Sequence, residues 1–406
     1  MERRKILFFK NFFKKNENIK INKNNKINQK RKKNLYKIVN KKYEKIISIL
    51  KLIFLIFLCF IYILISPKKI ILIKKRIGVL NLSNSNNVGN ILVKFSLFKK
   101  LKEFDFVPIM LVRRSKRKYN INFINRTVNL KIIQNKFSDL NESDYDYLIV
   151  NSDQTWNKDY NSDFYDIAFL KFAENWKINK FIYAASIGSD KWNFLRKDEI
   201  VASKLLKNFT GISFREKGLV QLAEEHLNLT IKPVFVLDPT LIIDKKYYLD
   251  EIKNYKRDFN FSIKFIYVYQ LDRNSIMKRF INEASKKIKY KVIKHERNKG
   301  DFIESFLFGM NNSQAVITDS FHGTVFSIIF NKPFITFLNK ARGKGRFDSL
   351  KEVFGLEKRI IDPFNFSSFT KINLLSEPLN INQTLINEFK IFSINYLKKN
   401  LGLLKN

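Results

Sequence analysis

The chain has 406 residues, a length that indicates one large domain or, closer to usual domain sizes, two. Hydrophobic residues make up 45% of it, including 40 Phe, which supplies ample apolar surface for buried cores and excludes a disordered chain. A single cysteine, Cys59, excludes a disulfide within the chain, and three histidines leave little room for a His/Cys metal site. We therefore expect metal-free chemistry in a reducing compartment.

The formal net charge of +39 first suggests a nucleic-acid partner, because basic proteins release counterions from phosphate backbones. The distribution of the charge argues against this. Residues 1–76 carry a net +20, and the remaining +19 is spread over 330 residues. Lys, Asn, Ile and Phe are favoured throughout, which fits a drift in composition. We expect no dedicated nucleic-acid surface.

Residues 1–45 are rich in Lys and Asn and lack a sustained apolar period, which predicts a disordered basic arm. A nearly continuous apolar stretch follows over residues 46–66. Its uninterrupted part, Leu52–Ile65, has 14 residues and is short for a bilayer span, although Lys51 could reach the lipid headgroups. We predict a membrane-anchor helix over 46–66, spanning or partly inserted. The alternative is a buried or spurious N-terminal extension.

The charges on either side of the apolar stretch conflict over orientation. The arm holds 17 Lys and Arg, whereas Lys68–Arg76 holds five, so the positive-inside rule would place the body of the protein outside the cell. A body that uses a cytosolic metabolite could not work there. A shallow anchor in the anionic inner leaflet, with the body at the cytoplasmic face of the membrane, fits better.

From Arg76 onward, short apolar runs alternate with stretches of helical length. Arg76–Leu82 predicts a strand, and apolar residues at helical spacing from Ile91 to Leu101 predict the helix that follows. Such alternation predicts an α/β fold with parallel sheets and helices on both faces. The other predicted strands are Val107–Val112, Tyr147–Asn151, Phe181–Ile187, Gly211–Phe214, Val234–Leu237, Lys264–Leu271, Lys291–Lys294, Ala315–Thr318 and Pro333–Phe337, and the other predicted helices include Glu216–His226, Ser275–Ile288 and Phe321–Phe330.

Six of these strands precede Asp238 and four follow it. We therefore expect two Rossmann-like domains, residues 76–236 and 245–385, joined by Leu237–Asp244 and followed by a C-terminal helix over residues 386–406. Ligands of parallel sheets bind beyond the carboxyl ends of the strands, so the site should lie in a cleft between the facing domains. The chain has no G-x-G-x-x-G and no Walker A motif, which argues against dinucleotide and ATP chemistry.

His322 is the most informative polar residue. It follows the predicted strand Ala315–Thr318 and opens an apolar helix, so we expect it at a buried helix N-terminus, where the dipole favours a neutral imidazole and bound anions. This position suits a general acid or base, or a phosphate contact. Gly323 beside it would let the backbone approach a ligand. The alternative is a capping cluster in which Asp319 or Ser320 caps the helix and His322 only packs.

Arg215 directly follows another predicted strand. Its guanidinium could hold a carboxylate or phosphate through two parallel hydrogen bonds, or it could pair with Glu216 or another acid. Asn87, Gly89 and Asn90 follow the first strand and could offer backbone N–H groups to an anion, although Asn and Gly are also ordinary turn and cap residues.

Ser152, Asp153 and Gln154 follow the strand Tyr147–Asn151 and precede Trp156. They could line a sugar site, with Trp156 packed on a sugar face. A capped helix start with a core Trp is the alternative.

The ordered set of segments after the strands resembles the polysaccharide pyruvyl transferase family over about Arg76 to Leu356. No single segment is diagnostic, but the last one is fairly specific and the order is informative. The segments are Arg76-Ile-Gly-Val-Leu with Asn87-Val-Gly-Asn-Ile-Leu92, Asn151-Ser-Asp-Gln-Thr-Trp-Asn157, Tyr183-Ala-Ala-Ser-Ile-Gly188, Ile212-Ser-Phe-Arg-Glu-Lys217, Val236-Leu-Asp-Pro-Thr240, and Ile317-Thr-Asp-Ser-Phe-His-Gly-Thr-Val-Phe-Ser327 with Asn331-Lys-Pro-Phe334.

The resemblance implies a two-domain fold similar to GT-B glycosyltransferases. It also implies transfer of an enolpyruvyl-derived group from phosphoenolpyruvate to two hydroxyls of a sugar, giving a pyruvate ketal on a cell-surface polysaccharide or its precursor. The expected partners are phosphoenolpyruvate and a sugar or lipid-linked saccharide, with no further cofactor. The family's conserved His falls on His322, as proton donor or phosphate contact, and its conserved Arg falls on Arg215, as an anion clamp.

Two positions depart from the family's pattern. Many members have Arg where this chain has Ser320, and many have Asp where it has Asn90. Ser320 removes a cation that would help to hold the donor, so another cation must replace it or the donor differs. The candidates are Lys332, Lys340, Arg342, Lys344 and Arg346, of which we take Lys344 and Arg346 as substrate-binding residues.

Two other functions stay open. One is a nucleotide-sugar glycosyltransferase on the same GT-B-type architecture. The other is a non-catalytic, membrane-associated scaffold of envelope polysaccharide assembly, which the basic arm, the apolar stretch and the two departures would suit.

Overall fold

The computed structural model forms two compact units, Met1–Ile73 and Lys74–Asn406. The predicted disordered arm over residues 1–45 lies almost entirely outside the described residues. The structure describes residues 37–38, 41–42, 44–57, 74–80, 87–113, 123, 126–128, 130–133, 137–157, 167–189, 191–255, 263–296, 301–364 and 366–404.

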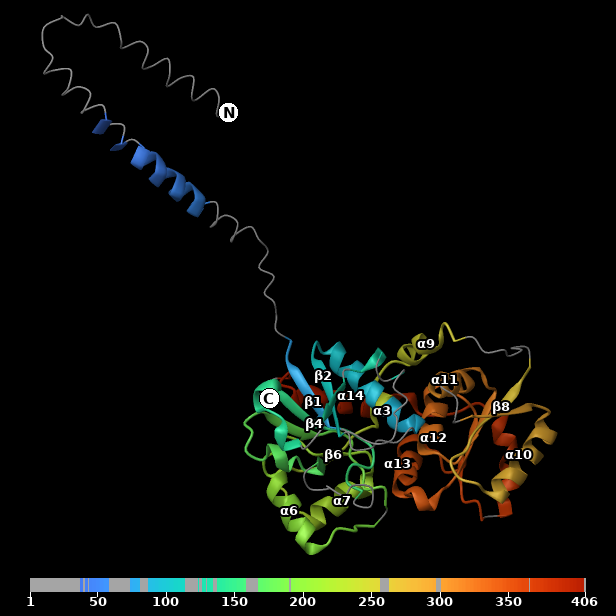
Figure 1. Ribbon diagram of the computed structural model, residues 1–406. Helices are drawn as coiled ribbons and strands as arrows, with labels where there is room; N and C mark the ends of the chain where they lie inside the picture. The colour runs from blue at the N-terminus through green and yellow to red at the C-terminus, as the bar shows by residue number, and fades with distance from the viewer. Residues whose placement is uncertain are drawn as a thin grey trace, which may run out of the picture. The chain divides into compact units, whose positions relative to one another are not determined.

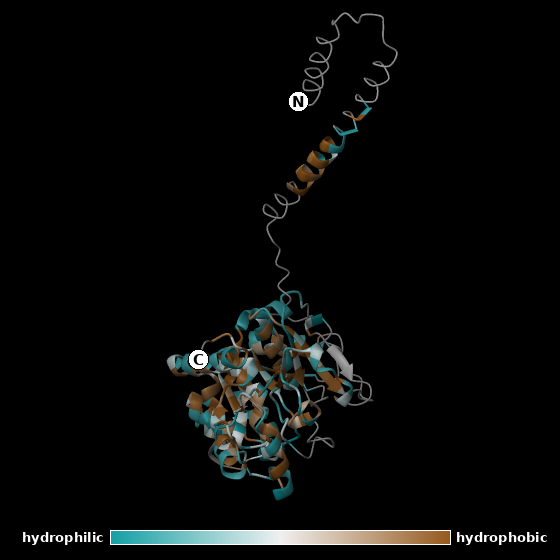
Figure 2. Ribbon diagram, turned by 90° about the vertical axis from the view of Figure 1, so that its left-hand side faces the viewer, coloured by the Kyte–Doolittle hydropathy of each residue, from teal (hydrophilic) through white to brown (hydrophobic). Residues whose placement is uncertain are grey.

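In the first unit, residues 44–57 form a helix that exposes its apolar side chains. The large apolar residues from Ile46 to Phe57 are 41–61% exposed, and Figure 2 shows the hydrophobic character of this helix. Residues 58–66 of the predicted anchor lie outside the described residues. Within the part of the chain that the structure describes, no helix has the length and apolarity needed to cross a bilayer.

The second unit contains a five-stranded parallel sheet in its first half, with the strand order β3-β2-β1-β4-β5. A two-stranded parallel sheet, β6-β7, continues it through bridges from Gly211 to Phe181 and from Phe214 to Ala185. Strands such as Tyr147–Val150 are apolar and wholly buried, as in sheets covered on both faces. The bounds are β1 (Arg76–Leu80), β2 (Val107–Arg113), β3 (Leu130–Ile133), β4 (Tyr147–Val150), β5 (Asn179–Ile182), β6 (Ser213–Phe214) and β7 (Val234–Phe235).

The second half of this unit contains another five-stranded parallel sheet, with the order β12-β11-β10-β8-β9. The two parallel sheets confirm the predicted α/β fold class. Seven described strands precede Asp238 and five follow it, more than the sequence predicted, because β3 and β12 were not expected. The bounds are β8 (Phe265–Tyr269), β9 (Lys291–Lys294), β10 (Ala315–Thr318), β11 (Phe334–Phe337) and β12 (Ile360–Ile361).

Helices connect the strands and join the two halves, and Figure 1 shows α3 and α12 between the labelled strands of the two sheets. An aromatic chain links them: the ring of Tyr248 lies 5.9 Å from that of Phe95 on α3 and 5.0 Å from that of Phe326 on α12. The principal helices are α3 (Val88–Glu103), α6 (Arg196–Leu206), α7 (Lys217–His226), α8 (Pro239–Ile242), α9 (Lys245–Ile252), α10 (Ser275–Ile288), α11 (Phe302–Asn312), α12 (Phe321–Ile329), α13 (Gly345–Phe354) and α14 (Gln383–Asn400).

The last helix, α14, returns to the first half. The hydroxyl of Tyr396 donates to the carbonyl of Ile182 at the end of β5, at 2.7 Å. The N–H of Leu237 donates to the hydroxyl of Ser393 at 2.9 Å. α14 therefore packs against the first sheet although it follows the second one in the chain.

Candidate functional site

Each sheet has a switch point, where the connections from neighbouring strands lead to opposite sides. In the first sheet this point lies between β1 and β4, and in the second it lies between β8 and β10. Parallel sheets bind their ligands at such points, beyond the carboxyl ends of the strands. Gly89 and Asp153 follow the first pair, and His322 follows β10. Direct contacts connect these residues, so the two switch points meet.

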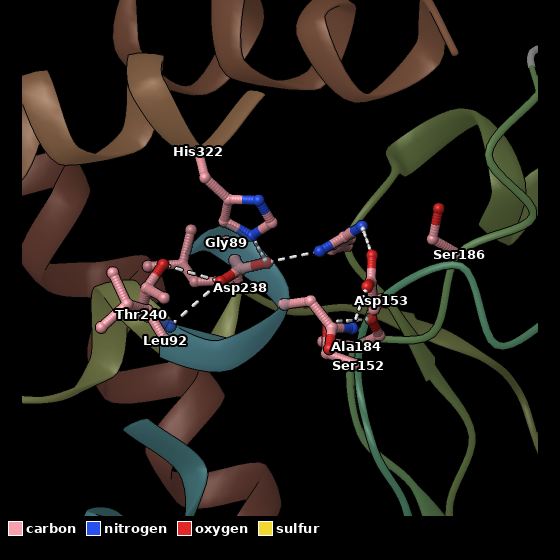
Figure 3. A network of polar contacts seen from close by, with 12 residues as sticks. Gly89, Leu92, Ser152, Asp153, Ala184, Ser186, Asp238, Thr240 and His322 are labelled. Carbon is pink, nitrogen blue, oxygen red and sulfur yellow. Dashed lines mark hydrogen bonds and ion pairs between the residues drawn. The ribbon is translucent and has the colours of Figure 1, made fainter. Parts of the chain in front are cut away.

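Asp238 lies at the centre of these contacts (Figure 3). It begins α8 in the segment between the halves, and its Oδ1 accepts hydrogen bonds from the N–H of Thr240 at 3.0 Å and from its hydroxyl at 2.7 Å. Its Oδ2 accepts from Nη1 of Arg215 at 2.7 Å and lies 3.5 Å from Nε2 of His322. One carboxylate, 1% exposed, thus joins a guanidinium of the first half to an imidazole of the second.

The guanidinium of Arg215 lies between two carboxylates. Its Nη2 donates to Oδ1 of Asp153 at 3.1 Å, in addition to the bond from Nη1 to Asp238. The amide of Asn90 donates to the other oxygen of Asp153 at 2.5 Å. Arg215 therefore pairs with acids, one of the two alternatives that the sequence left open. Its Nε has no hydrogen-bond partner among the described residues.

Asp153 is held in a strained backbone conformation. Its φ is 95°, and Ala184, on the neighbouring loop, has a φ of 55°. Side chains of two serines fix this loop: the hydroxyl of Ser152 donates to the carbonyl of Ala184 at 2.7 Å, and the N–H of Ala184 donates to the hydroxyl of Ser213 at 3.0 Å. Non-glycine residues in this region cost about 1–3 kcal/mol each and persist where the surroundings enforce them, often at functional sites.

The imidazole of His322 lies against the first turn of α3. A Cβ atom on Gly89 would come within 1.9 Å of Nδ1 of His322, so any side chain at this position would collide with the ring. Asn87 caps α3, and its side-chain oxygen accepts from the N–H of Gly89 at 2.9 Å. Because this N–H already has a partner, we correct the expectation that it is available to an anion. Gly89 instead provides space for His322.

The capping alternative for His322 is wrong. Ser320 is the N-cap residue of α12, but its side chain makes no capping bond. The carboxylate of Asp319 accepts from the N–H groups of Leu271 and Asp272 at 2.6 and 2.9 Å and holds the loop after β8. The side chain of His322 contacts Asp238 instead.

Burial by itself would raise the pKa of Asp238, but the contact with His322 and the charge of Arg215 outweigh it and hold the pKa well below the usual range. The pKa of Asp153 is lowered in the same way: Arg215, His322 and the amide of Asn90 outweigh burial. On α3, burial lowers the pKa of Lys94 to about 8, although Asp153 partly offsets this. At neutral pH the two aspartates are therefore ionised.

A second contact between the halves lies beside the first. Gly343, before α13, has a φ of 91°, and a Cβ atom there would come within 2.5 Å of the carbonyl oxygen of Gly188, after β5. Arg346, in the first turn of α13, is 7% exposed. Its Cζ lies 5.4 Å from the ring centre of Phe321, and that of Arg215 lies 5.0 Å from the same ring. Two guanidiniums thus share one aromatic ring next to His322.

Several cations were considered as replacements for the Arg that is missing at position 320. Of these, Arg346 is the one that lies over the ring of Phe321. Lys344 is 45% exposed and 3.5 Å from Asp348, one turn along α13. Lys340 pairs with Asp362 at 2.8 Å, and Arg342 with Asp272 at 2.6 Å. Burial lowers the pKa of Lys332, which the charge of Lys245 lowers further.

The other predicted binding residues serve local packing. Ser152 holds Ala184 and is fully buried, and Gln154 lies against Gly188, where a Cβ atom would come within 2.5 Å of it. Trp156 is also fully buried, with the ring of Phe214 at 4.9 Å, so it cannot stack on a sugar. The core position of Trp156 in the alternative holds, but residues 151–157 form turns and not a helix start.

Ser320 and Gly323 are likewise committed to the turn after β10. The N–H of Ser320 donates to the hydroxyl of Thr318 at 3.1 Å. A Cβ atom on Gly323 would come within 2.2 Å of the same hydroxyl, so this glycine allows α12 to lie close to β10. Neither residue has a side chain that contacts Asp238.

Residues 87–340 match the model of the family described as Polysaccharide pyruvyl transferase, a range that includes Asp153, Arg215, Asp238 and His322. The chain belongs to this family. No curated protein sequence matches the chain. The membership confirms the resemblance that the segments after the strands indicated.

Solved structures of other proteins align with this polysaccharide pyruvyl transferase family member. UDP-GlcNAc 2-epimerase from Neisseria meningitidis, bound to UDP-GlcNAc, aligns with a TM-score of 0.52 and 11% identity over 80% of this chain and 100% of its own. HepE (Alr3699) from Anabaena, in complex with UDP and glucose, aligns with a TM-score of 0.48 and 9% identity over 81% of this chain and 100% of its own. The fold is α/β with two parallel sheets, similar to GT-B-like epimerases.

Neither Asp238 nor Phe321 was predicted from the sequence to have a role in the site. Asp238 lies in the segment between the halves, where an Asp before Pro at the end of a strand is also typical of a helix start. The signal that could have identified Asp238 is its place in Val236-Leu-Asp-Pro-Thr240, one of the segments that carry the family resemblance. Phe321 gave no signal, since an aromatic residue opening an apolar helix is typical of a core.

Proposed function

We propose that this protein is an enzyme that transfers a pyruvyl group from phosphoenolpyruvate to a sugar of a cell-surface polysaccharide or its precursor. The observation that carries the proposal is the shared carboxylate: Asp238 lies 2.7 Å from Arg215 and 3.5 Å from His322, which come from different halves of a family member. Protonation of C3 of phosphoenolpyruvate gives an electrophilic C2 that a sugar hydroxyl can attack, a reaction that needs placed proton carriers and anion-holding donors.

We assign the proton-handling role to His322 and an orienting role to Asp238, which faces its Nε2. Arg215 differs from its expected role as a direct clamp. Because both terminal nitrogens already bind Asp238 and Asp153, its main effect in our proposal is to hold the two carboxylates in place. Arg346, over Phe321, would supply the cation that the family usually has at position 320.

We further propose that the N-terminal helix brings the enzyme to the anionic cytoplasmic face of the membrane. Residues 44–57 expose apolar side chains, and residues 1–76 carry a net charge of +20. An apolar helix flanked by many lysines binds anionic lipid interfaces both through burial of its apolar side chains and through electrostatic attraction. Lipid-linked saccharides, which are among the proposed acceptors, are located at the same surface.

The test is release of phosphate from phosphoenolpyruvate with a panel of lipid-linked and nucleotide-linked saccharides, combined with mass spectrometry of the acceptor. We expect phosphate release together with a pyruvate ketal on one acceptor class, and His322→Ala should lower turnover by about 100-fold or more. Stabilisation of the folded protein by UDP or GDP sugars but not by phosphoenolpyruvate would favour the glycosyltransferase instead. Saccharide binding without turnover of any donor would favour the scaffold.

A further inference from the structure

Glu216 lies beside the site and has no role in the proposed function so far. It is 3% exposed and precedes α7, but its side chain does not cap this helix. The hydroxyl of Ser186 donates to its Oε1 at 2.5 Å and accepts from the N–H of Gly188 at 3.0 Å. The other oxygen, Oε2, is buried and has no hydrogen-bond partner among the described residues.

A buried carboxylate oxygen without a partner destabilises the ionised form of the group more than the neutral acid, because the charge loses more hydration on burial. The charged groups that face Glu216 come from several elements: Arg215 precedes it, Arg346 is on α13, and Asp153 follows β4. Burial raises the pKa of Glu216, and Asp153 adds to this, against the opposing effects of Arg215, Ser186 and Arg346.

Glu216 therefore differs from its neighbours Asp153 and Asp238, whose pKa values are lowered. Sites in which neighbouring carboxyl groups are shifted in opposite directions commonly divide acid and base roles between them. The position also suits a role in the reaction. Ser186 and Glu216 follow β5 and β6 at the same edge of the sheet as Asp153, next to the contact between Gly188 and Gly343.

We propose that Glu216 is a second proton-carrying residue of the transfer reaction, which enters the reaction as a neutral acid and protonates C3 of the donor. This inference rests on the proposed function. The O–H bond of Glu216 breaks as the C3–H bond forms, and the first sugar hydroxyl attacks C2 while its proton passes to His322. The C2–O bond to phosphate then breaks, and His322 returns that proton to the leaving phosphate. The second hydroxyl attacks C2, and its proton restores neutral Glu216.

The protonation state can be tested without any turnover. The infrared difference spectrum of wild type minus Glu216→Gln at pH 7 should contain the carbonyl stretch of a protonated carboxylic acid. Glu199→Gln is the matched control. Glu199 is also buried, but Arg196, Trp192 and His226 outweigh burial and lower its pKa, so its replacement should remove no such band. Absence of the band from the Glu216 difference spectrum overturns the proposal.

The role in transfer is tested by the pH dependence of phosphate release. Glu216→Gln should lower kcat by about 100-fold or more with little change in KM for phosphoenolpyruvate, and should remove the fall in activity that accompanies deprotonation of Glu216. Ser186→Ala keeps the acid but removes a hydrogen bond that lowers its pKa, so this fall should move to higher pH. Burial and Asp153 set the pKa of Lys94, so a fall in activity due to deprotonation of Lys94 should not shift in this way.

The outcomes separate this inference from the proposed function. A Glu216→Gln variant with wild-type kcat and an unchanged pH profile, or a Ser186→Ala variant whose profile does not move, overturns the role of Glu216 while leaving the transferase proposal in place. A wild-type chain that shows the acid band but releases no phosphate overturns the proposed function and, with it, the role of Glu216 in transfer. The assignment of a neutral Glu216 would then still hold.

Discussion

At the scale of single residues, the two halves of the second unit converge on Asp238. Its carboxylate has four contacts, to the backbone and hydroxyl of Thr240, to Arg215 and to His322, and water reaches only 1% of its side chain. Removal of one member of this buried network should destabilise the folded protein, because the remaining charges then stay in an apolar environment without a partner. Asp238 should therefore matter for stability as well as for turnover.

The pH dependence of stability gives a test of Asp238. Its pKa in the folded protein is below the unfolded value of about 3.9, so its contribution is fully present above that value and is lost as the pH falls through the folded pKa. Asp238→Asn should destabilise the protein by about 3 kcal/mol at pH 7, since it leaves Arg215 underpaired. Urea unfolding between pH 7 and pH 3 should show this difference shrinking toward acid pH; a difference independent of pH would contradict the ion pairing.

Gly89 gives a test of how His322 is positioned. Gly89→Ala places a methyl group 1.9 Å from Nδ1 of the imidazole, so the ring must move, and we expect turnover to fall by about 100-fold while α3 stays formed. Gly218→Ala in α7 is the control, because its Cβ would meet nothing within 4 Å and alanine stabilises a helix by up to about 1 kcal/mol over glycine. Equal activities of the two variants in a phosphate-release assay would show that the packing of His322 is not critical.

At the scale of elements, α13 reaches the loop after β5 at a position where no side chain fits. Gly343→Ala and Gly355→Ala form a matched pair, since both glycines have positive φ, of 91° and 65°, but only the Cβ at 343 meets a neighbouring backbone. Gly355→Ala should lower the free energy of unfolding by only about 1–2 kcal/mol, the strain of a Cβ atom at positive φ. Gly343→Ala should also separate Gly188 from α13 and lower kcat. A thermal melt and a turnover assay on both variants distinguish the two effects.

The elements that the sequence predicted best are those with strong local patterns. β9, β10 and α10 have the predicted bounds, because each is an apolar or amphipathic run that polar or turn residues delimit. β12 is only two residues long, too short to show a period, whereas β3 was missed although it is as long as β9 and β10. The return of α14 to β5 depends on Tyr396 donating to a backbone carbonyl, and such a contact has no signature along the chain.

The parts of the candidate site differ in the same way in how far the sequence predicts them. His322 and Arg215 were predicted because each follows a predicted strand and belongs to a segment with a family resemblance. Their connection through Asp238 is a tertiary contact, and no spacing along the chain encodes it. The strained φ of Asp153 was equally hidden, since Asp after a strand is compatible with an ordinary turn.

At the scale of the whole molecule, the chain consists of a basic N-terminal unit and a second unit that contains the site. The second unit begins slightly before the predicted Arg76: Lys74 pairs with Asp105, and the carbonyl of Lys75 accepts from the N–H of Val107 at 2.9 Å. A truncation that preserves these contacts should end at Ile73.

Removal of residues 1–73 should therefore leave the melting temperature and phosphate release unchanged but abolish membrane binding. The measurement is co-sedimentation with phosphatidylglycerol-containing vesicles, with pure phosphatidylcholine vesicles as the control for charge. We expect the full chain to sediment mainly with the anionic vesicles and the truncated chain to stay in the supernatant. Equal sedimentation of both chains would locate the lipid-binding surface on the second unit.

The return of α14 has a consequence for how the protein is made. The hydroxyl of Tyr147 in β4 donates to the carbonyl of Leu401 at 3.0 Å, across 254 positions of the chain. During translation, the strands of the first half therefore emerge from the ribosome well before the segment that completes their packing. Until that segment arrives, the nascent first half has an uncovered apolar surface, so chaperone binding should last until α14 has left the exit tunnel.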